Sequence, residues 1–560
     1  MIITESVAGD PAGRRPRPWP VRLLVPATVA LAATAWLGLN FDIRYVFGGL
    51  RAGPGTVFDT FVHRPFAYRI LVWLLDLGPD VLTPHARAGV VAEAIVRAEA
   101  FLLVTAVCVL LWAGLRRHRP GPLPAAVAVA VWCALTLVPN WSFLEPDWAG
   151  ALWATAALGA ALFPRRVVVA APLTGLLVVL CVATKLTTAP YALIAAGVVW
   201  LIDRRRAWLG AAWSAGFAVV WLAATWLFDP LEWQWLHDMS ALVPSSPLRL
   251  GLGGLDWAAF RESAANLLVV SPVVLAIPAA TVVLARSASR PGAVFAGVAG
   301  AVVLATLPVL GQGEWYLYQW VALPVLAAGL GAAALATRPA PAQVAAVLLP
   351  AVAGGVFSAI ALTRSLEWRT THLPQVAMVL VLFPVIGAAL GCARRTGRLR
   401  GARGFGVLSL VVAFGAANLP AAAYALTMAH AEDTNLSRYE ASADLRWQLS
   451  LLRDEIGADT AVLYFATGED NYVLGNPTDC PYPSPVWLQR STFLPYVKDF
   501  RSYAGNVSCL DTTARYLVID RSWFDISRLD PALAARVAAT FDCAHAIHAT
   551  ADIDACPRRG

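Results

Sequence analysis

Apolar runs of about twenty residues recur through the first three quarters of this 560-residue chain, and short polar turns separate them. A helical run of this length matches the hydrocarbon thickness of a lipid bilayer. Only 14% of the residues are charged, whereas soluble domains carry roughly 25%. The pattern therefore predicts an α-helical polytopic membrane protein with about 13 transmembrane helices.

The net charge of +7 comes from arginine clusters that lie in alternate turns. The turns between them carry acids and most of the tryptophans and tyrosines that flank the apolar runs. By the positive-inside rule, the arginine-rich turns face the cytoplasm, so no nucleic-acid partner is expected. With an odd number of spans, the N-terminus is cytoplasmic and the C-terminal segment lies outside the plasma (inner) membrane. The clusters include Arg116–Arg119, Arg165–Arg166, Arg204–Arg206 and Arg394–Arg403.

The chain divides into three parts: a cytoplasmic tail over 1–20, a transmembrane domain over 21–429 and an extracytoplasmic soluble domain over 430–560. In the last part, Leu436–Ile456 has helical apolar spacing, while Thr460–Phe465 and Ala514–Ile519 have the composition of strands. We therefore expect a small α/β domain. The last predicted span before it covers Val407–Met428.

Four of the eight cysteines lie in this polar C-terminal segment. Their number suggests two disulfides and an oxidising compartment, which agrees with the topology, although three pairings are possible. A zinc site is the alternative, but no C-x-x-C pair is present, and we predict no metal site or cofactor. The four residues are Cys480, Cys509, Cys543 and Cys556.

The stretch Asn40–Leu75 concentrates ionisable residues in a chain that is otherwise mostly Ala, Val and Leu. Asp42 directly follows the first predicted span, which places it at the membrane surface, and it is the first candidate for a catalytic acid or base. The alternatives are that Asp42 only ends the span and faces water, or that Asp59 has the catalytic role. The residues Phe61–Leu82 suit an amphipathic helix in the membrane interface.

Other ionisable residues fall near the same predicted outer face, where charges are costly and often functional. Glu145 and Asp147 are the second candidate acids, or else solvated turn residues. Lys185 separates two apolar runs, Val167–Ala183 and Thr188–Ile202, where it either binds an anion or merely snorkels. Cations can bind a phosphate while a carboxylate takes a proton from a hydroxyl. The candidate phosphate-binding residues are Arg44, Arg64, Arg69, Lys185, His237, Arg364 and Arg369.

Aromatic residues cluster between Trp315 and Trp320, including Tyr316 and Tyr318. Such rings can stack on the faces of sugars, and they also form belts at membrane interfaces.

Three features resemble the GT-C superfamily, the polytopic glycosyltransferases that use polyprenyl-phosphate sugars. They are the acid soon after the first span, Phe41-Asp42-Ile43-Arg44-Tyr45; the cationic break Thr184-Lys185-Leu186-Thr187; and the phrase Arg515–Trp523 in the C-terminal segment. The resemblance implies inverting transfer of a hexosyl or pentosyl group from a polyprenyl phosphate to an envelope glycan or lipid acceptor. It also implies that Asp42 is the base and that cations hold the phosphate.

Two other classes of protein are compatible with a polytopic chain. A lipid or glycolipid transporter or flippase predicts an inverted repeat and charges in the middle of spans, and the sequence shows neither. A non-catalytic membrane protein of envelope assembly remains open.

Overall fold

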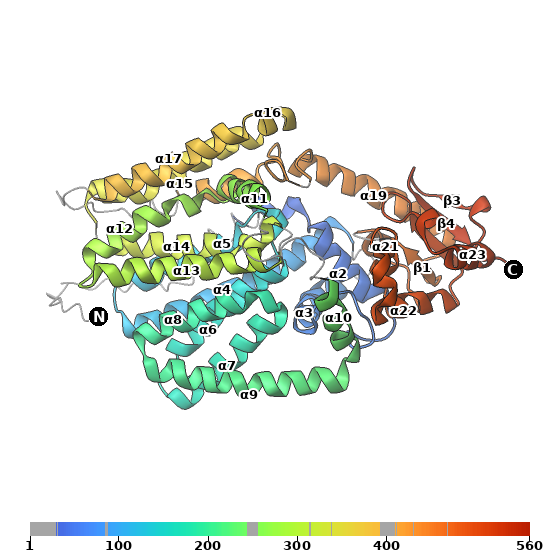
Figure 1. Cartoon of the computed structure of the whole chain (residues 1–560), viewed down its shortest axis with the longest axis horizontal. Helices are drawn as coiled ribbons and strands as arrows, with labels where there is room; N and C mark the ends of the chain where they lie inside the picture. Colours follow the sequence, from blue (N-terminus) through green and yellow to red (C-terminus); the bar gives the residue numbers. More distant parts are fainter. Residues whose placement is uncertain are drawn as a thin grey trace.

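The structure is a computed structural model that describes residues 30–560, except 31, 84–87, 243–255, 313–314, 338, 393–408, 410, 429 and 467–468. A bundle of apolar helices forms the larger part, and the C-terminal segment covers one end of it, with the C-terminus at the far tip (Figure 1). The first half of the bundle and its connections contain α2 (Phe41–Ala52), α3 (Phe66–Leu82), α4 (Val90–His118), α5 (Leu123–Thr136), α6 (Pro146–Leu162), α7 (Val167–Thr184), α8 (Ala189–Ile202), α9 (Arg204–Phe228) and α10 (Pro230–Leu242).

The second half of the bundle contains seven further helices in the described part of the chain. Among the described residues, seven helices are long and apolar enough to cross a membrane, and an eighth span results if the pair bent by 92° at Ser271 counts as one. The protein is therefore an integral membrane protein, while the count of thirteen spans stays a prediction. The helices are α11 (Trp257–Val270), α12 (Ile277–Ser287), α13 (Pro291–Gln312), α14 (Ala322–Ala336), α15 (Pro341–Leu362), α16 (Leu366–Thr371) and α17 (Leu373–Gly391).

The predicted break at Lys185 is present: α7 ends at Thr184, the short helix η3 (Leu186–Thr188) follows, and α8 begins at Ala189. The predicted helix over Phe61–Leu82 begins only at Phe66, after Pro65. The predicted first span and the Arg394–Arg403 turn lie mostly or wholly outside the described residues.

The predicted span Val407–Met428 is wrong in its second half. Helical backbone ends with η9 (Ala416–Asn418), and an irregular segment follows Pro420. Backbone N–H groups of this segment donate to residues of other helices: the Ala423 N–H donates to the Leu362 carbonyl at 2.8 Å, and the Leu426 N–H donates to Asn266 Oδ1 at 2.7 Å. Apolar composition alone did not reveal that this stretch is buried in protein and folded back on itself.

The C-terminal segment contains the expected α/β structure. Helix α19 (Asn435–Ile456) leads into a four-stranded sheet of order β1-β2-β4-β3, in which β1 and β2 are parallel and the other pairs are antiparallel. Two disulfides, Cys480–Cys509 and Cys543–Cys556, confirm the predicted number and fix the pairing. The remaining elements are β1 (Val462–Phe465), α20 (Asp470–Leu474), α21 (Val486–Ser491), α22 (Arg501–Ser508), β2 (Tyr516–Asp520), α23 (Pro531–Thr540), β3 (Ile547–His548) and β4 (Ile553–Pro557).

The C-terminal segment packs directly on α2 and the loop after it. A Cβ added to Gly48 would lie 2.4 Å from the Tyr472 backbone nitrogen, so this glycine permits the close approach of α20. The Phe61 N–H donates to the Pro481 carbonyl at 2.7 Å, and the Thr478 N–H donates to the Ala52 carbonyl at 2.8 Å. The hydrophobic core therefore runs continuously from the bundle into the C-terminal segment.

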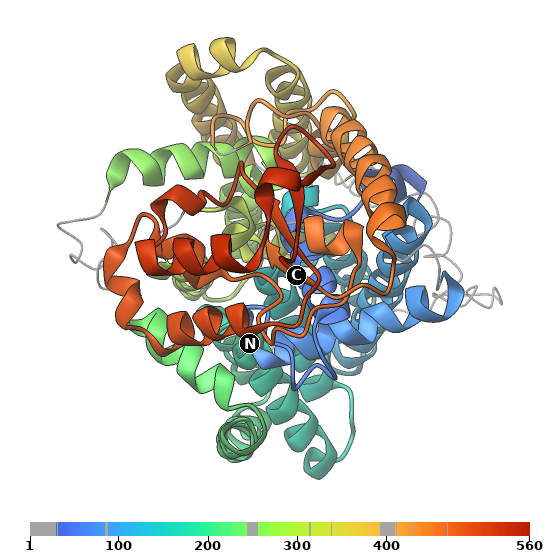
Figure 2. The same ribbon diagram turned by 90° about the vertical axis from the view of Figure 1, so that its right-hand side faces the viewer.

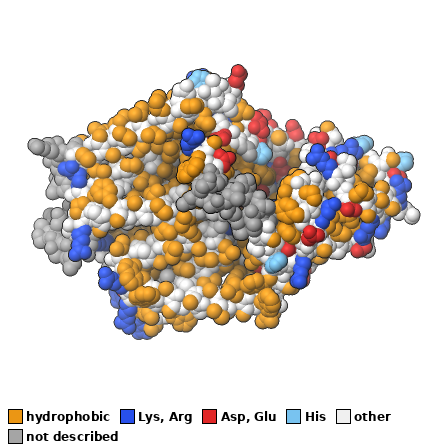
Figure 3. All heavy atoms as spheres, viewed as in Figure 1, with side chains coloured by type: hydrophobic (Ala, Val, Ile, Leu, Met, Phe, Trp, Pro, Cys, Tyr) orange, Lys and Arg blue, Asp and Glu red, His pale blue; other side chains and the backbone are white. Residues whose placement is uncertain are grey.

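The two ends of the bundle differ in charge. Viewed from the side of the C-terminal segment, that segment lies in front of the helices (Figure 2). On the face drawn in Figure 3, apolar side chains cover most of the bundle, Lys and Arg gather at the end away from the C-terminal segment, and acids lie near the junction with that segment. This polarity agrees with the predicted alternation of turns, and the polar candidates must be sought at the junction.

Candidate functional site

Four polar segments at the N-terminal ends of helices lie at this junction. They are the first turn of α2, the residues directly before α3, the residues directly before α6, and the break between α7 and α8. Side-chain contacts join them in pairs: Arg64 to Asp42, Asn40 to Glu145, and Lys185 to Asp147. The structure thus brings together five of the predicted residues, Asp42, Arg64, Glu145, Asp147 and Lys185.

Asp42 lies in the first turn of α2, where the partial positive charge of the helix end favours a carboxylate. Its partner is Arg64, whose Nη2 lies 3.5 Å from Asp42 Oδ1, and each side chain is 27% exposed. The contact is long for a charge-assisted hydrogen bond. Asp42 and Arg64 are therefore loosely paired and both remain accessible to a ligand.

Glu145 precedes α6 and is 1% exposed. Asn40 Nδ2 donates to Glu145 Oε1 at 3.0 Å, while Asn40 Oδ1 accepts from the Tyr424 hydroxyl at 3.2 Å. Burial raises the pKa of Glu145 well above its ordinary value, and the charge of Asp42 raises it further. Glu145 is thus favoured in its neutral form, which distinguishes it from the more exposed Asp42 as a candidate base.

Asp147 and Lys185 form a tighter pair. Lys185 Nζ lies 2.7 Å from Asp147 Oδ2; Asp147 is fully buried, while the Lys185 side chain is 19% exposed. The ammonium also lies 4.9 Å from the centre of the Tyr318 ring, a cation–π distance. Lys185 can therefore offer its free hydrogens to an anion while Asp147 holds it in place.

The aromatic cluster around Tyr318 divides in two. Trp315 and Trp320 are buried, and Trp320 Nε1 donates to Ser263 Oγ at 2.8 Å. Tyr316 and Tyr318 stack on each other instead, with ring centres 5.4 Å apart. Tyr318 of this pair contacts Lys185.

Two predicted phosphate-binding arginines of the first loop are enclosed by other groups. Arg44 bonds Glu93 and Glu469, so it connects α2 to α4 and to the C-terminal segment. Arg69 is 0% exposed and bonds Asp229 and Glu232.

The other three predicted cations contact groups other than Asp42. Arg369 donates to the carbonyls of Ala425, Leu426 and Ala431, and so holds the irregular segment before α19. Arg364 is exposed beside Trp368, and the His237 side chain is 81% exposed next to Asp238.

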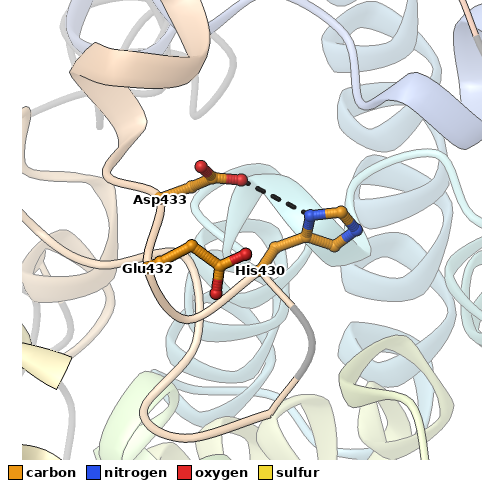
Figure 4. A group of neighbouring side chains, drawn as sticks. All are labelled: His430, Glu432 and Asp433. Atoms are coloured by element: carbon orange, nitrogen blue, oxygen red, sulfur yellow. Dashed lines mark ion pairs between the residues drawn. The ribbon is translucent and has the colours of Figure 1, made fainter. Parts of the chain in front are cut away.

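One group of described residues has the geometry to hold a metal ion. Ligand atoms of His430, Glu432 and Asp433 lie within 4.8 Å of one another, and His430 Nδ1 is 3.4 Å from Asp433 Oδ2 (Figure 4). Arg438 Nη1 already lies 2.9 Å from the same Asp433 oxygen and 3.3 Å from His430 Nδ1. A guanidinium thus supplies positive charge at this group, and we assign no metal to it.

Sequence reasoning missed Asn40 and the two acids that hold Arg44, Glu93 and Glu469. Asn40 lies between the first predicted span and Asp42. A polar amide at the end of an apolar run was a signal that its side chain forms specific hydrogen bonds. Glu93 and Glu469 gave no comparable signal, because their partner Arg44 is 49 and 425 residues away.

No protein-family model matches the sequence, and no curated protein matches it. Among solved structures, ArnT from Cupriavidus metallidurans bound to undecaprenyl phosphate is similar, with a TM-score of 0.50 and 16% identity over 96% of this chain and 97% of that one. The archaeal oligosaccharyltransferase AglB from Archaeoglobus fulgidus, in complex with an inhibitory peptide and a dolichol-phosphate, gives a TM-score of 0.36 and 12% identity over 93% of this chain and 72% of that one. The likeness to ArnT covers nearly the whole length of both chains. It confirms the predicted fold: the chain has a GT-C-like fold.

Proposed function

We propose that this protein is an inverting glycosyltransferase that moves a sugar from a polyprenyl phosphate to a hydroxyl of an envelope glycan or lipid acceptor. The observation that carries the proposal is the Asp42–Arg64 pair: a carboxylate and a guanidinium, both partly exposed and loosely joined, at the polar end of an apolar bundle. The GT-C-like fold supports the same class of reaction. The acceptor, the sugar and the extracytoplasmic location remain parts of the proposal.

In this mechanism the Asp42 carboxylate takes the proton of the acceptor hydroxyl as its oxygen attacks the anomeric carbon. A new carbon–oxygen bond forms, the bond from the anomeric carbon to the phosphate oxygen breaks, and the polyprenyl phosphate leaves with the electron pair. Arg64 and Lys185 bind the phosphate and stabilise the charge that grows on it. Glu145, which is favoured as a neutral acid, is not the base in this scheme.

Arg64 and Lys185 are preferred to the other predicted cations for a physical reason. Arg44, Arg69 and Arg369 already use their donors on buried acceptors, and withdrawing them would leave those acceptors unsatisfied. Arg64 and Lys185 each have one close carboxylate partner and retain solvent exposure.

The test compares sugar transfer by the purified full-length chain, wild type and Asp42→Asn, with polyprenyl-phosphate pentose and hexose donors. We expect Asp42→Asn to lower kcat on the order of 10²–10⁴-fold, the usual contribution of a general base, with little change in thermal stability. The matched control is Asp59→Asn in the same loop, where the exposed Asp59 carboxylate only accepts from Thr56 at 2.8 Å.

Equal loss in both variants would point to disturbance of the loop, and loss in Asp59→Asn alone would move the base to Asp59. Absence of transfer by the wild-type protein with every donor class would contradict the proposal. That result would favour a transporter or an assembly protein.

A further inference from the structure

His63, the residue before Arg64, is a buried histidine with an unusual backbone. Its φ is 53°, and the residue is 6% exposed. This left-handed region is uncommon for residues other than glycine, and it is a genuine outlier for β-branched residues. A left-handed residue redirects the chain, so the direction in which Arg64 leaves the loop depends on what holds His63.

The C-terminal segment holds it. Trp487 Nε1 donates to His63 Nδ1 at 3.2 Å, and the Tyr482 ring stacks on the imidazole at 5.7 Å with 24° between the planes. Because Nδ1 accepts a hydrogen bond, the imidazole is neutral and carries its proton on Nε2. Burial favours the same form, since it lowers the pKa of His63 well below its ordinary value, and the charges of Arg490, Arg64 and Arg69 add to the effect.

The backbone on the other side of Arg64 is fixed as well. Arg69 Nε donates to the Arg64 carbonyl at 3.1 Å, and Pro65 restricts the chain directly before α3 begins. Arg64 Nη1 itself donates to the His63 carbonyl at 3.2 Å. Arg64 thus stands between two anchored residues, and only its side chain is free to reach Asp42.

We propose that His63 is a positioning residue through which the C-terminal segment aims Arg64 at Asp42 and at the donor phosphate. The proposal rests on the proposed glycosyl transfer. The C-terminal segment then contributes to donor binding without touching the donor, by way of Trp487 and Tyr482. Both residues follow Cys480, which the Cys480–Cys509 disulfide ties to α22 and its neighbours.

The first arm of the test measures transfer kinetics of the full-length chain. His63→Val disfavours the left-handed backbone, whereas His63→Asn tolerates it. We expect His63→Val to lower kcat/KM for the donor on the order of tenfold to a hundredfold, the cost of misplacing a binding group by about an ångström. His63→Asn, whose Oδ1 can accept from Trp487 in place of Nδ1, retains most of the activity, and Trp487→Phe, which removes the donor, falls between the two.

Non-additivity separates positioning from general damage. In an Arg64→Ala background, His63→Val should cause no further loss, because the group that it aims is already missing. The matched control is Gly457→Val, which forces the same kind of strain on a residue with φ 88° in the turn after α19. It should lower the melting temperature and leave the donor KM unchanged. An equal fold-loss from His63→Val with and without Arg64 would overturn the proposal.

The second arm does not depend on activity. A Cys392→Ser background removes the free cysteine that is exposed, and the other three free cysteines are buried. In this background, Asp42→Cys/Arg64→Cys is treated with a short bifunctional methanethiosulfonate reagent. We expect a cross-link with His63 or His63→Asn and a much weaker one with His63→Val. Equal cross-linking in all three would refute the positioning role, even if the wild-type protein transferred no sugar and the proposed function itself failed.

Discussion

Arg64 lies in the loop before α3, and Arg69, five residues later, lies in the first turn of α3; the structure gives them opposite surroundings. Arg69 is 0% exposed and bonds the carbonyls of Val57, Thr60 and Arg64 together with two carboxylates. Arg64 is 27% exposed and has one carboxylate partner at 3.5 Å. The same type of side chain thus forms a buried structural ion pair at position 69 and is an accessible cation at position 64.

The difference lies in what each guanidinium would leave behind if it moved. Removing Arg69 leaves two buried carboxylates and three carbonyls without a partner. The free-energy cost of leaving them unpaired exceeds the free energy gained from a contact with a ligand. Removing Arg64 strands only a partly hydrated Asp42. An arginine can bind substrate when its existing partners tolerate its loss, and that condition can be tested at both positions.

The largest effect on stability is expected from Arg69→Met. The substitution keeps an apolar stem and leaves Asp229 and Glu232 buried without their cation, so the free energy of unfolding should fall by about 5 kcal/mol. Thermal unfolding in detergent, followed by circular dichroism, measures the change. The comparison fails if Arg69→Met is as stable as the wild type.

An intermediate effect is expected from Lys185→Met, because its partner Asp147 is buried. We expect a loss of about 3 kcal/mol in stability, together with a large loss of transfer activity. The double variant Lys185→Met/Asp147→Asn removes the stranded charge, so it should regain stability and stay inactive. Recovery of activity in the double variant would exclude Lys185 as a phosphate ligand.

The positions of the transmembrane helices were predictable because they follow runs of apolar residues, and the fold departed from these runs in few places. The break at Lys185 and the end of the helix before α19 are one correct and one wrong prediction. At Lys185 a charge between two apolar runs indicated the break correctly. Val407–Met428 is apolar to its end, but in its second half tertiary hydrogen bonds to Asn266 and Leu362 replaced the expected helix.

The site was predictable as a list of candidates and not as an arrangement. Sequence position placed Asp42, Glu145 and Lys185 at one end of the bundle, since each adjoins an apolar run. It could not tell Arg64 from Arg44 or Arg69, because the acids that enclose the latter two come from α4, from α10 and the residue before it, and from the C-terminal segment. Pairing over such separations depends on the tertiary fold.

The smallest effect on stability is expected from Arg64→Ala, and this prediction gives the comparison its sharpest form. The ion pair to Asp42 is partly exposed, so its loss should change the free energy of unfolding by less than about 1 kcal/mol. The donor KM should rise about ten- to a hundredfold, because a charge-assisted hydrogen bond to phosphate contributes about 1.5–3 kcal/mol. Arg64→Lys should fall between Ala and wild type, since it keeps the charge but loses the planar fork that matches a phosphate. Titration of a polyprenyl-phosphate sugar against each variant measures the KM, and a melting curve of the same samples measures stability. If Arg64→Ala lost as much free energy of unfolding as Arg69→Met, both arginines would have a structural role. Lys185 would then be the remaining candidate ligand of the phosphate.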